Sequence, residues 1–220
     1  DSANRQRSLG DKMMTYDANG NLASLTDSTG TTTITWDARN RLSAVTGPGV
    51  MASFTYDSTG RRVQKTVNTV TTQFQYDRGN LVRELVEGHE VRYLHSLRLD
   101  ETFCRLEPEG ESYYLADGLS STIALVNASG TPSTTYTYEP FGRTATAGAP
   151  SGNPLQYTGR ELESSGLYYY RARYYAPTLG RFLAEDPIKI VGGSLNFYAY
   201  VKNRPLNFTD PTGLLLLDCT

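Results

Sequence analysis

The sequence has no long hydrophobic run, and this absence argues against a membrane-spanning helix. No stretch approaches the about eighteen apolar residues that a membrane-spanning helix needs. The first residues, Asp1-Ser2-Ala3-Asn4-Arg5, also lack the basic segment and apolar stretch that mark a signal peptide. We therefore expect neither a membrane span nor a signal peptide in these 220 residues.

An excess of charge of either sign is also missing. The chain has 21 Lys and Arg residues against 23 Asp and Glu residues, which gives a net charge of −2. A nearly neutral chain has no electrostatic drive to bind the phosphate backbone of nucleic acid or an anionic membrane surface. We expect neither as a partner.

Residues that bind metals are scarce. Cys104 and Cys219 lie far apart without a C-x-x-C spacing, and His89 and His95 do not have the spacing of three or four residues typical of metal ligands. We expect free structural cysteines, no metal site and no cofactor.

Turn formers and strand formers are abundant instead. The chain contains 20 Gly, 10 Pro and 16 Tyr residues, and 38% of its residues are hydrophobic. Gly and Pro favour turns, whereas aromatic and β-branched residues favour strands. The hydrophobic fraction is large enough to fill a core at this length. The composition therefore predicts a folded, all-β protein.

A pattern recurs every twenty residues through the first half of the chain. Each copy has an aromatic-Asp pair, then a residue that tolerates positive φ, then a hydrophobic position. The aromatic-Asp pairs are Tyr16-Asp17, Trp36-Asp37, Tyr56-Asp57 and Tyr76-Asp77. The turn residues are Gly20, Asn40, Gly60 and Asn80, and the hydrophobic positions are Leu22, Leu42, Val63 and Leu81.

Each repeat predicts one β-hairpin. The segments between the turns alternate, so that Ile34 and Trp36, for example, fall on one face of a strand. A single hairpin cannot bury its apolar face, so successive hairpins must pair edge to edge into one antiparallel sheet. We expect the four repeat aromatics on the same face of that sheet, with strands at this period through residue 85. The repeat Asp should cap its turn by accepting backbone N–H groups.

The pattern resembles the YD repeats of the Rhs family, which also occur in the C components of insecticidal toxin complexes and in teneurins. Residues 114–143 resemble a late, degenerate repeat, with a predicted hairpin formed by 123–127 and 136–138 and with Glu139 where Asp is usual. Residues 144–154 are rich in Ala, Gly, Pro and Ser, which predicts an exposed loop.

Residues 156–214 are similar to the Rhs-repeat-associated core. The motifs that carry this similarity are Tyr157-Thr158-Gly159-Arg160, the tyrosine-rich stretch 166–175, Gly180-Arg181-Phe182-Leu183-Ala184-Glu185-Asp186-Pro187, the stretch 196–203 and Asp210-Pro211-Thr212-Gly213-Leu214. The resemblance divides the chain into a YD-repeat sheet (1–110), a late repeat with its loop (111–155), the core (156–214) and the start of a C-terminal tail (215–220). We expect at most one or two short helical turns, all within the core.

The resemblance also implies a function. Family members build a β-sheet that spirals into a hollow shell, the core closes one end, and a C-terminal toxin lies inside. The core acts as an aspartic autoprotease and cuts after the Leu of the last Asp-Pro-x-Gly-Leu motif. For this sequence it implies Asp186 and Asp210 as the catalytic pair, Arg173 as their orienting cation, and cleavage between Leu214 and Leu215. The first Asp-Pro motif departs from the family pattern, with Lys189 and Ile190 where Gly and Leu are usual, and Ala176 replaces another usual Asp.

Two carboxylates are a chemically sensible pair for cutting an amide. One can activate water while the other, kept neutral by its neighbour, protonates the leaving group. A turn through Pro211 and Gly213 can bring the 214–215 peptide to Asp210. Arg171 and Arg181 are alternatives to Arg173 for orienting a carboxylate. Both Asp-Pro motifs are also ordinary β-turn sequences, and the arginines could instead stack on tyrosine rings.

Three functions remain open on the sequence. The first is a self-cleaving shell domain that encapsulates a toxin and is secreted or delivered by a secretion system. The second is the same fold as a non-cleaving shell or plug. The third is a teneurin-like extracellular recognition module, in which the tyrosines of 168–170 and 174–175 stack on sugars, although alternation along a strand favours core packing for them. The expected partners are the C-terminal toxin polypeptide and the remainder of the shell, and an open sheet edge near the N-terminus could pair with a second copy.

Overall fold

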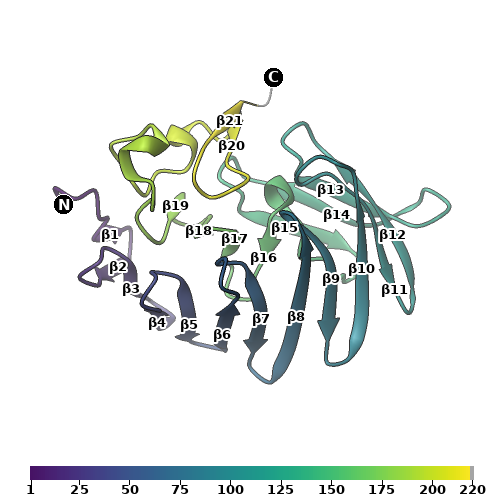
Figure 1. Ribbon diagram of the computed structural model, residues 1–220, viewed down its shortest axis with the longest axis horizontal. Helices are drawn as coiled ribbons and strands as arrows, with labels where there is room; N and C mark the ends of the chain where they lie inside the picture. The colour runs from purple at the N-terminus through teal and green to yellow at the C-terminus, as the bar shows by residue number, and fades with distance from the viewer. Residues whose placement is uncertain (219–220) are drawn as a thin grey trace.

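The computed structural model describes residues 1–218, and these residues contain one large sheet and two small ones. The large sheet has fifteen strands, each hydrogen-bonded to the next one along the chain (Figure 1). Its pairings are antiparallel throughout. The strands are β1 (Ser8–Leu9), β2 (Lys12–Tyr16), β3 (Leu22–Asp27), β4 (Gly30–Trp36), β5 (Leu42–Gly47), β6 (Val50–Tyr56), β7 (Arg62–Val67), β8 (Val70–Asp77), β9 (Asn80–Val86), β10 (His89–His95), β11 (Thr102–Glu107), β12 (Gly110–Ala116), β13 (Thr122–Val126), β14 (Pro132–Tyr138) and β15 (Thr144–Gly148).

The last third of the described chain forms short elements. Four strands make the second sheet: β16 (Glu161–Leu162), β17 (Tyr168–Tyr170), β18 (Arg173–Ala176) and β19 (Arg181–Phe182). A two-stranded ribbon consists of β20 (Phe208–Thr209) and β21 (Leu217–Asp218). Residues 1–218 also contain three 3-10 turns, one more than the one or two expected: η1 (Tyr157–Gly159), η2 (Lys189–Gly192) and η3 (Val201–Asn203). None of these is long and apolar enough to cross a bilayer.

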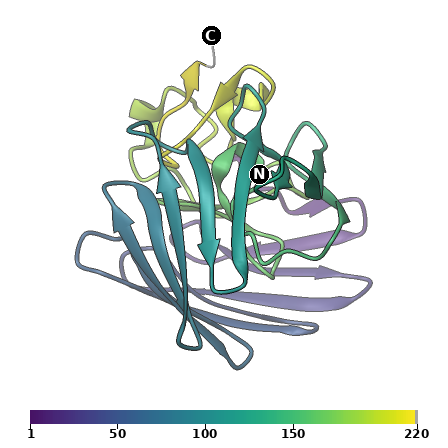
Figure 2. The same ribbon diagram turned by 90° about the vertical axis from the view of Figure 1, so that its right-hand side faces the viewer.

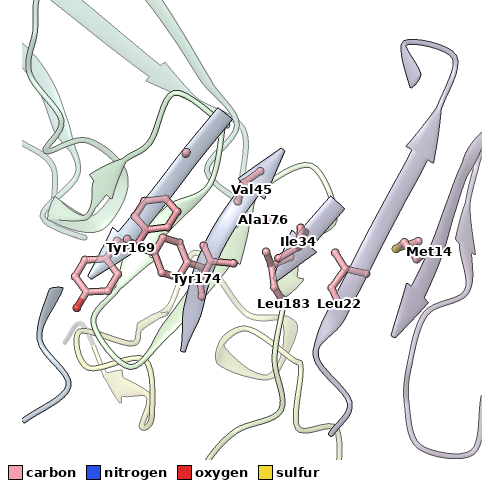
Figure 3. Packing of buried hydrophobic residues seen from close by; sticks show 11 residues of the cluster. Met14, Leu22, Ile34, Val45, Tyr169, Tyr174, Ala176 and Leu183 are labelled. Carbon is pink, nitrogen blue, oxygen red and sulfur yellow. The ribbon is translucent and has the colours of Figure 1, made fainter. Parts of the chain in front are cut away.

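The large sheet curves around the second sheet. In Figures 1 and 2, strands β1–β15 wrap around β16–β19, and the C-terminal segment with β20 and β21 lies at one end of the curved sheet. Side chains from both sheets fill the space between them. Figure 3 shows Met14, Leu22, Ile34 and Val45 of the large sheet in one buried cluster with Tyr169, Tyr174, Ala176 and Leu183. The all-β, antiparallel prediction is confirmed.

The repeat aromatics lie on one face of the large sheet, as predicted. Tyr16, Trp36 and Tyr56 pack against the cluster between the sheets, and Tyr76 packs against a neighbouring cluster. Two of their polar groups bind the backbone of the preceding hairpin: Trp36 Nε1 donates to the Leu22 carbonyl at 2.8 Å, and the Tyr56 hydroxyl donates to the Leu42 carbonyl at 2.7 Å. The aromatic rings therefore contribute to the core, and Trp36 and Tyr56 also tie their strands to the preceding hairpin.

The repeat aspartates cap their turns in three of the four repeats. Asp57 Oδ1, for example, accepts the N–H groups of Thr59 and Arg61 at 2.9 and 3.0 Å. Asp17 and Asp37 do the same in their own turns.

The fourth repeat differs, and the expectation for Asn80 is wrong. Asp77 and Asn80 face each other in the ladder, so only two residues form the turn, and Arg78 rather than Asn80 has positive φ (53°). The Asn80 side chain instead bonds Arg98 and Asp100 in the loop between β10 and β11.

The buried position of the third repeat is Arg62, so the choice of Val63 is wrong. Arg62 faces Tyr56 across the ladder, where the other repeats place Leu, and it is fully buried. Its guanidinium lies between the rings of Phe74 and Tyr169, 4.4 and 4.3 Å from their centroids. The carboxylates of Glu161 in β16 and of Glu163, which directly follows β16, bind it, which is why a cation is tolerated in this core.

Two other expectations need comment. The exposed loop predicted at 144–154 begins as strand β15, and Asn153 and Pro154 at its end are buried, so it is a loop only in part. The tyrosines of β17 and β18 are all buried, and their alternation divides them between two clusters. Cys104 is a buried free cysteine, whereas Cys219 and the end of the 215–220 tail lie outside the described residues.

Candidate active site

Asp186, Asp210 and Arg173 meet on the side of the second sheet that faces the C-terminal segment. Arg173 begins β18, Asp186 lies between β19 and η2, and Asp210 directly follows β20. One nitrogen, Arg173 Nη2, lies 3.0 Å from Asp186 Oδ2 and 3.3 Å from Asp210 Oδ2. Two oxygens bound to one nitrogen at these distances lie at most 6.3 Å apart, and one water molecule bridges oxygens up to about 6 Å apart.

Each aspartate also serves its own turn. Asp210 Oδ1 accepts the N–H groups of Leu214 and Leu215 at 2.9 and 3.1 Å, and Asp186 Oδ1 accepts the N–H group of Ile188 at 3.0 Å. The β-turn interpretation of both Asp-Pro motifs is therefore realised through Oδ1. The Oδ2 atoms are used differently, because both face the same buried arginine.

Arg173 is held from several sides. It is only 4% exposed, its guanidinium carbon lies 3.7 Å from the centroid of the Phe182 ring, and it donates to the carbonyl oxygens of Phe197 and Gly213. Burial lowers the pKa of Arg173, and the two carboxylates counter that shift. The ring stacking expected of a non-catalytic arginine is thus also present, together with contact to both carboxylates.

The alternative arginines lie elsewhere. Arg181 binds the Asn4 carbonyl and the Gln6 side chain and stacks on Tyr198. Arg171 binds Asp100 and the carbonyl of Pro211.

The peptide between Leu214 and Leu215 lies at the carboxylates. Its N–H group donates to Asp210 Oδ1. Its carbonyl oxygen lies near Gly192, where a Cβ atom would be 3.3 Å from that oxygen and 2.7 Å from Asp186 Oδ2. The nitrogen side of the peptide thus contacts Asp210, and the oxygen side shares the space beside Gly192 with Asp186.

A small cavity lies among these groups. Its volume is about 20 Å³, and its walls include Arg173, Asp186, Asp210, Gly192 and Leu214. A cavity of this size has room for one water molecule and has the polar walls that a buried water requires.

The electrostatics of the site favour the protonated form of Asp210. Burial raises the pKa of Asp210, the charge of Asp186 raises it further, and Arg173 and the two N–H donors only partly offset this. A carboxyl that retains its proton beside an ionised one is the arrangement that acid–base hydrolysis of an amide needs.

The sequence analysis did not identify Gly192. Gly192 leaves open the space shared by Asp186 and the Leu214 carbonyl. The adjacent glycines Gly192 and Gly193, placed between the two Asp-Pro motifs, were the available signal. Lys189, the departure from the family pattern, adopts a left-handed φ of 50°, and Asp186 still reaches Arg173.

The repeats match a family model described as RHS Repeat, over residues 16–49 and again over 36–69. A search of known proteins finds toxins with the same kind of sequence. Toxin subunit YenC2 of Yersinia entomophaga is 45% identical over 86 residues, which cover 37% of this chain and 9% of the relative. The chain is an Rhs-repeat protein.

This Rhs-repeat protein spans only a small part of such relatives. Toxin protein Tse5 of Pseudomonas aeruginosa is 46% identical over 68 residues, which cover 30% of this chain and 5% of Tse5. Among solved structures, the TcdB2-TccC3-Cdc42 crystal structure matches 92% of this chain and 13% of its own, with a TM-score of 0.70 and 22% identity. At that identity the structural match establishes the fold, a long antiparallel sheet of the Rhs type.

Proposed function

We propose that this chain is part of an Rhs shell protein that encloses a C-terminal toxin polypeptide and releases it by hydrolysing its own Leu214–Leu215 peptide bond. The observation that carries the proposal is the single Arg173 nitrogen within 3.0 and 3.3 Å of both carboxylates, beside that peptide. The partners are the polypeptide that follows Leu214 and the remainder of the shell, which would continue from the sheet edge at β1. The toxin relatives support export from the producing cell.

The geometry supports a different role for each carboxylate. Asp186 is the base: it removes a proton from a water molecule in the 20 Å³ cavity as the water oxygen bonds to the Leu214 carbonyl carbon. Asp210, whose raised pKa favours the neutral form, gives its proton to the Leu215 nitrogen as the C–N bond breaks. The products are a carboxyl group on Leu214 and an amine on Leu215. Arg173 orients both carboxylates and stabilises the ionised one.

Autocleavage needs no substrate-binding step. The Leu214 and Leu215 N–H groups already hydrogen-bond to Asp210, so the scissile peptide is positioned within the same molecule. A single turnover suffices for release.

The test uses the chain extended past Thr220 by a folded reporter domain, with cleavage followed by mass spectrometry. Asp186→Asn and Asp210→Asn each remove an acid–base group while nearly preserving shape, so the rate should fall by roughly 100-fold or more. Asp117→Asn is the matched control, because Asp117 caps a repeat turn in the same way as Asn127 caps the next one. It should cleave at the wild-type rate.

A wild-type chain that stays intact, or Asp→Asn variants that cleave normally, would leave the non-cleaving shell or plug as the function. The sugar-stacking alternative finds little support, since the tyrosines of β17 and β18 are at most 2% exposed.

A further inference from the structure

A second buried ionic cluster joins the large sheet to the loop that carries Asp210. Arg171, in the turn between β17 and β18, lies at its centre. Its Nε and Nη2 atoms donate to the Gly79 carbonyl at 3.0 and 2.6 Å, and its Nη1 atom donates to the Pro211 carbonyl. Gly79 belongs to the β8–β9 turn of the large sheet, whereas Pro211 is the neighbour of Asp210. One guanidinium thus bridges the two.

Asp100 fixes the orientation of that guanidinium. Asp100, in the loop between β10 and β11, places Oδ1 2.6 Å from Arg171 Nη2 and Oδ2 3.3 Å from Nη1. The carboxylate also binds Arg160, and the Asp100 N–H group donates to Asn80 beside Gly79. Two turns of the large sheet therefore hold one side of Arg171 in a fixed frame.

Asp100 is also needed for charge balance. Arg160 is buried and the Arg171 side chain is only 19% exposed, and burial lowers the pKa of Arg160 to about 9 and that of Arg171 to about 10. Their like charges repel, and Asp100 is the carboxylate that both bind. Without this carboxylate, Arg171 loses its partner and faces another cation, so its guanidinium should leave the site.

The loop that carries Asp210 also contacts the turn between β17 and β18 through its backbone. The Ala172 N–H group donates to the Thr212 carbonyl at 3.2 Å, and any Cβ at Gly213 would collide with the Tyr170 carbonyl. The position of Asp210 therefore depends on how this turn sits against the large sheet. A displacement of about 1 Å at a reacting group can reduce a rate by about 100-fold.

We infer that Arg171 and Asp100 are positioning residues that make cleavage after Leu214 depend on the folded repeat sheet. This inference rests on the proposed self-cleavage. Neither residue touches the reacting atoms; both act through Pro211 on the placement of Asp210. The arrangement delays release of the C-terminal polypeptide until the turns at Gly79 and Asp100 have formed.

The first test is Arg171→Ala in the reporter-extended chain. Its cleavage rate should fall by about 10- to 100-fold at temperatures where circular dichroism shows a folded protein. A cavity of about 260 Å³ beside Arg171, lined also by Gly79 and Thr212, gives small ions access. Added guanidinium ion, below denaturing concentration, should restore the rate about 10-fold, whereas methylammonium at equal concentration should not.

Arg181→Ala is the matched control, because Arg181 is a partly buried arginine of the same small sheet without contact to the Asp210 loop. It should cleave normally. Arg171→Ala cleaving at the wild-type rate, or slowing without guanidinium rescue, would overturn the inference.

A second readout does not depend on cleavage. In the Asp186→Asn background, hydrogen exchange of the Leu214 and Leu215 amides should be about 10-fold faster in Arg171→Ala and in Asp100→Asn than in Arg181→Ala. Unchanged exchange would refute the positioning role. Faster exchange in a protein whose wild type never cleaves would support the positioning role and refute the proposed function.

Discussion

The repeat turns and the Asp-Pro turns use the same local device with opposite electrostatic results. In the Asp57 turn, Oδ1 accepts the Thr59 hydroxyl and two backbone N–H groups, and Oδ2 binds the half-exposed Arg61. These hydrogen bonds, that of the Thr59 hydroxyl above all, lower the pKa of Asp57 to about 2. Asp210 also accepts two N–H groups and faces an arginine, yet burial raises its pKa. Burial and a second carboxylate distinguish a structural cap from a candidate acid.

The comparison also explains why the Asp-Pro turns need not have lost their structural role. Oδ1 of Asp186 and Asp210 still caps a turn, and Oδ2 of each faces the shared arginine. The site requires no new kind of turn. It requires two Asp-capped turns whose carboxylates reach one buried arginine. In each experiment below, we expect a change in an Asp-Pro turn and a change in a repeat turn to have different effects.

The largest contrast is expected between two glycines. Gly192→Ala places a methyl group 2.7 Å from Asp186 Oδ2, so the carboxylate must move, and cleavage should slow by at least about 10-fold. Gly118→Ala, in the Asp117 repeat turn, meets open space and should leave the rate unchanged. Thermal unfolding of both variants, followed by circular dichroism, checks that neither change acts through loss of fold. Equal cleavage by the two variants would contradict the placement of Asp186.

An intermediate contrast is expected in pH dependence. Carbon-13 NMR of the side-chain carboxyls should show Asp57 titrating near pH 2 and Asp210 above its ordinary value of 3.8. The Asp210→Asn spectrum identifies the second resonance by its disappearance.

The consequences for stability have opposite signs. The Asp57 cap stabilises the fold above the ordinary pKa, and that contribution is lost as the pH falls toward 2. Asp210 contributes a loss of stability as the pH rises from 3.8 through its raised folded pKa, because the unfolded chain releases its proton first. Cleavage should slow over the same rise, as the acid form of Asp210 disappears. An Asp210 that titrates below Asp57 would contradict the assignment of the acid.

The smallest contrast concerns backbone strain. Lys189 has a left-handed φ of 50°. In the repeat turn at residue 60, a glycine occupies the position with positive φ. Lys189→Gly should raise the free energy of unfolding by about 1 kcal/mol or less, whereas Gly60→Ala should lower it by about 1 kcal/mol. Chemical denaturation measures both changes. Destabilisation by Lys189→Gly would mean that the lysine side chain contributes more than its backbone costs.

Local patterns in the sequence predicted the parts of the molecule that depend on local chemistry. The twenty-residue period placed the hairpins and the inward face of Trp36, because strand alternation and turn geometry act over a few residues. The composition and spacing could not show that Arg62 replaces a core leucine, since its partners Glu161 and Glu163 lie about a hundred positions away.

The site likewise combines residues that local motifs predicted with residues that they did not. Asp186, Asp210 and Arg173 were identified through motifs, and their convergence follows from the way β18 and the two Asp-Pro turns pack. Gly192 and the Arg171–Asp100 pair carry no periodic signal, because their roles arise from contacts between distant segments. The Asn80 turn was missed because one residue fewer in the fourth repeat changes the turn type.

The most direct test of the account is the intact mass of the wild-type chain, extended past Thr220 and incubated in water enriched in oxygen-18. Hydrolysis by a water between Asp186 and Asp210 predicts two fragments, one ending at Leu214 with a heavy oxygen in its new carboxyl group and one beginning at Leu215. The Asp210→Asn chain should stay whole under the same conditions. A wild-type chain that also stays whole, or that breaks at another bond, would contradict the central claim.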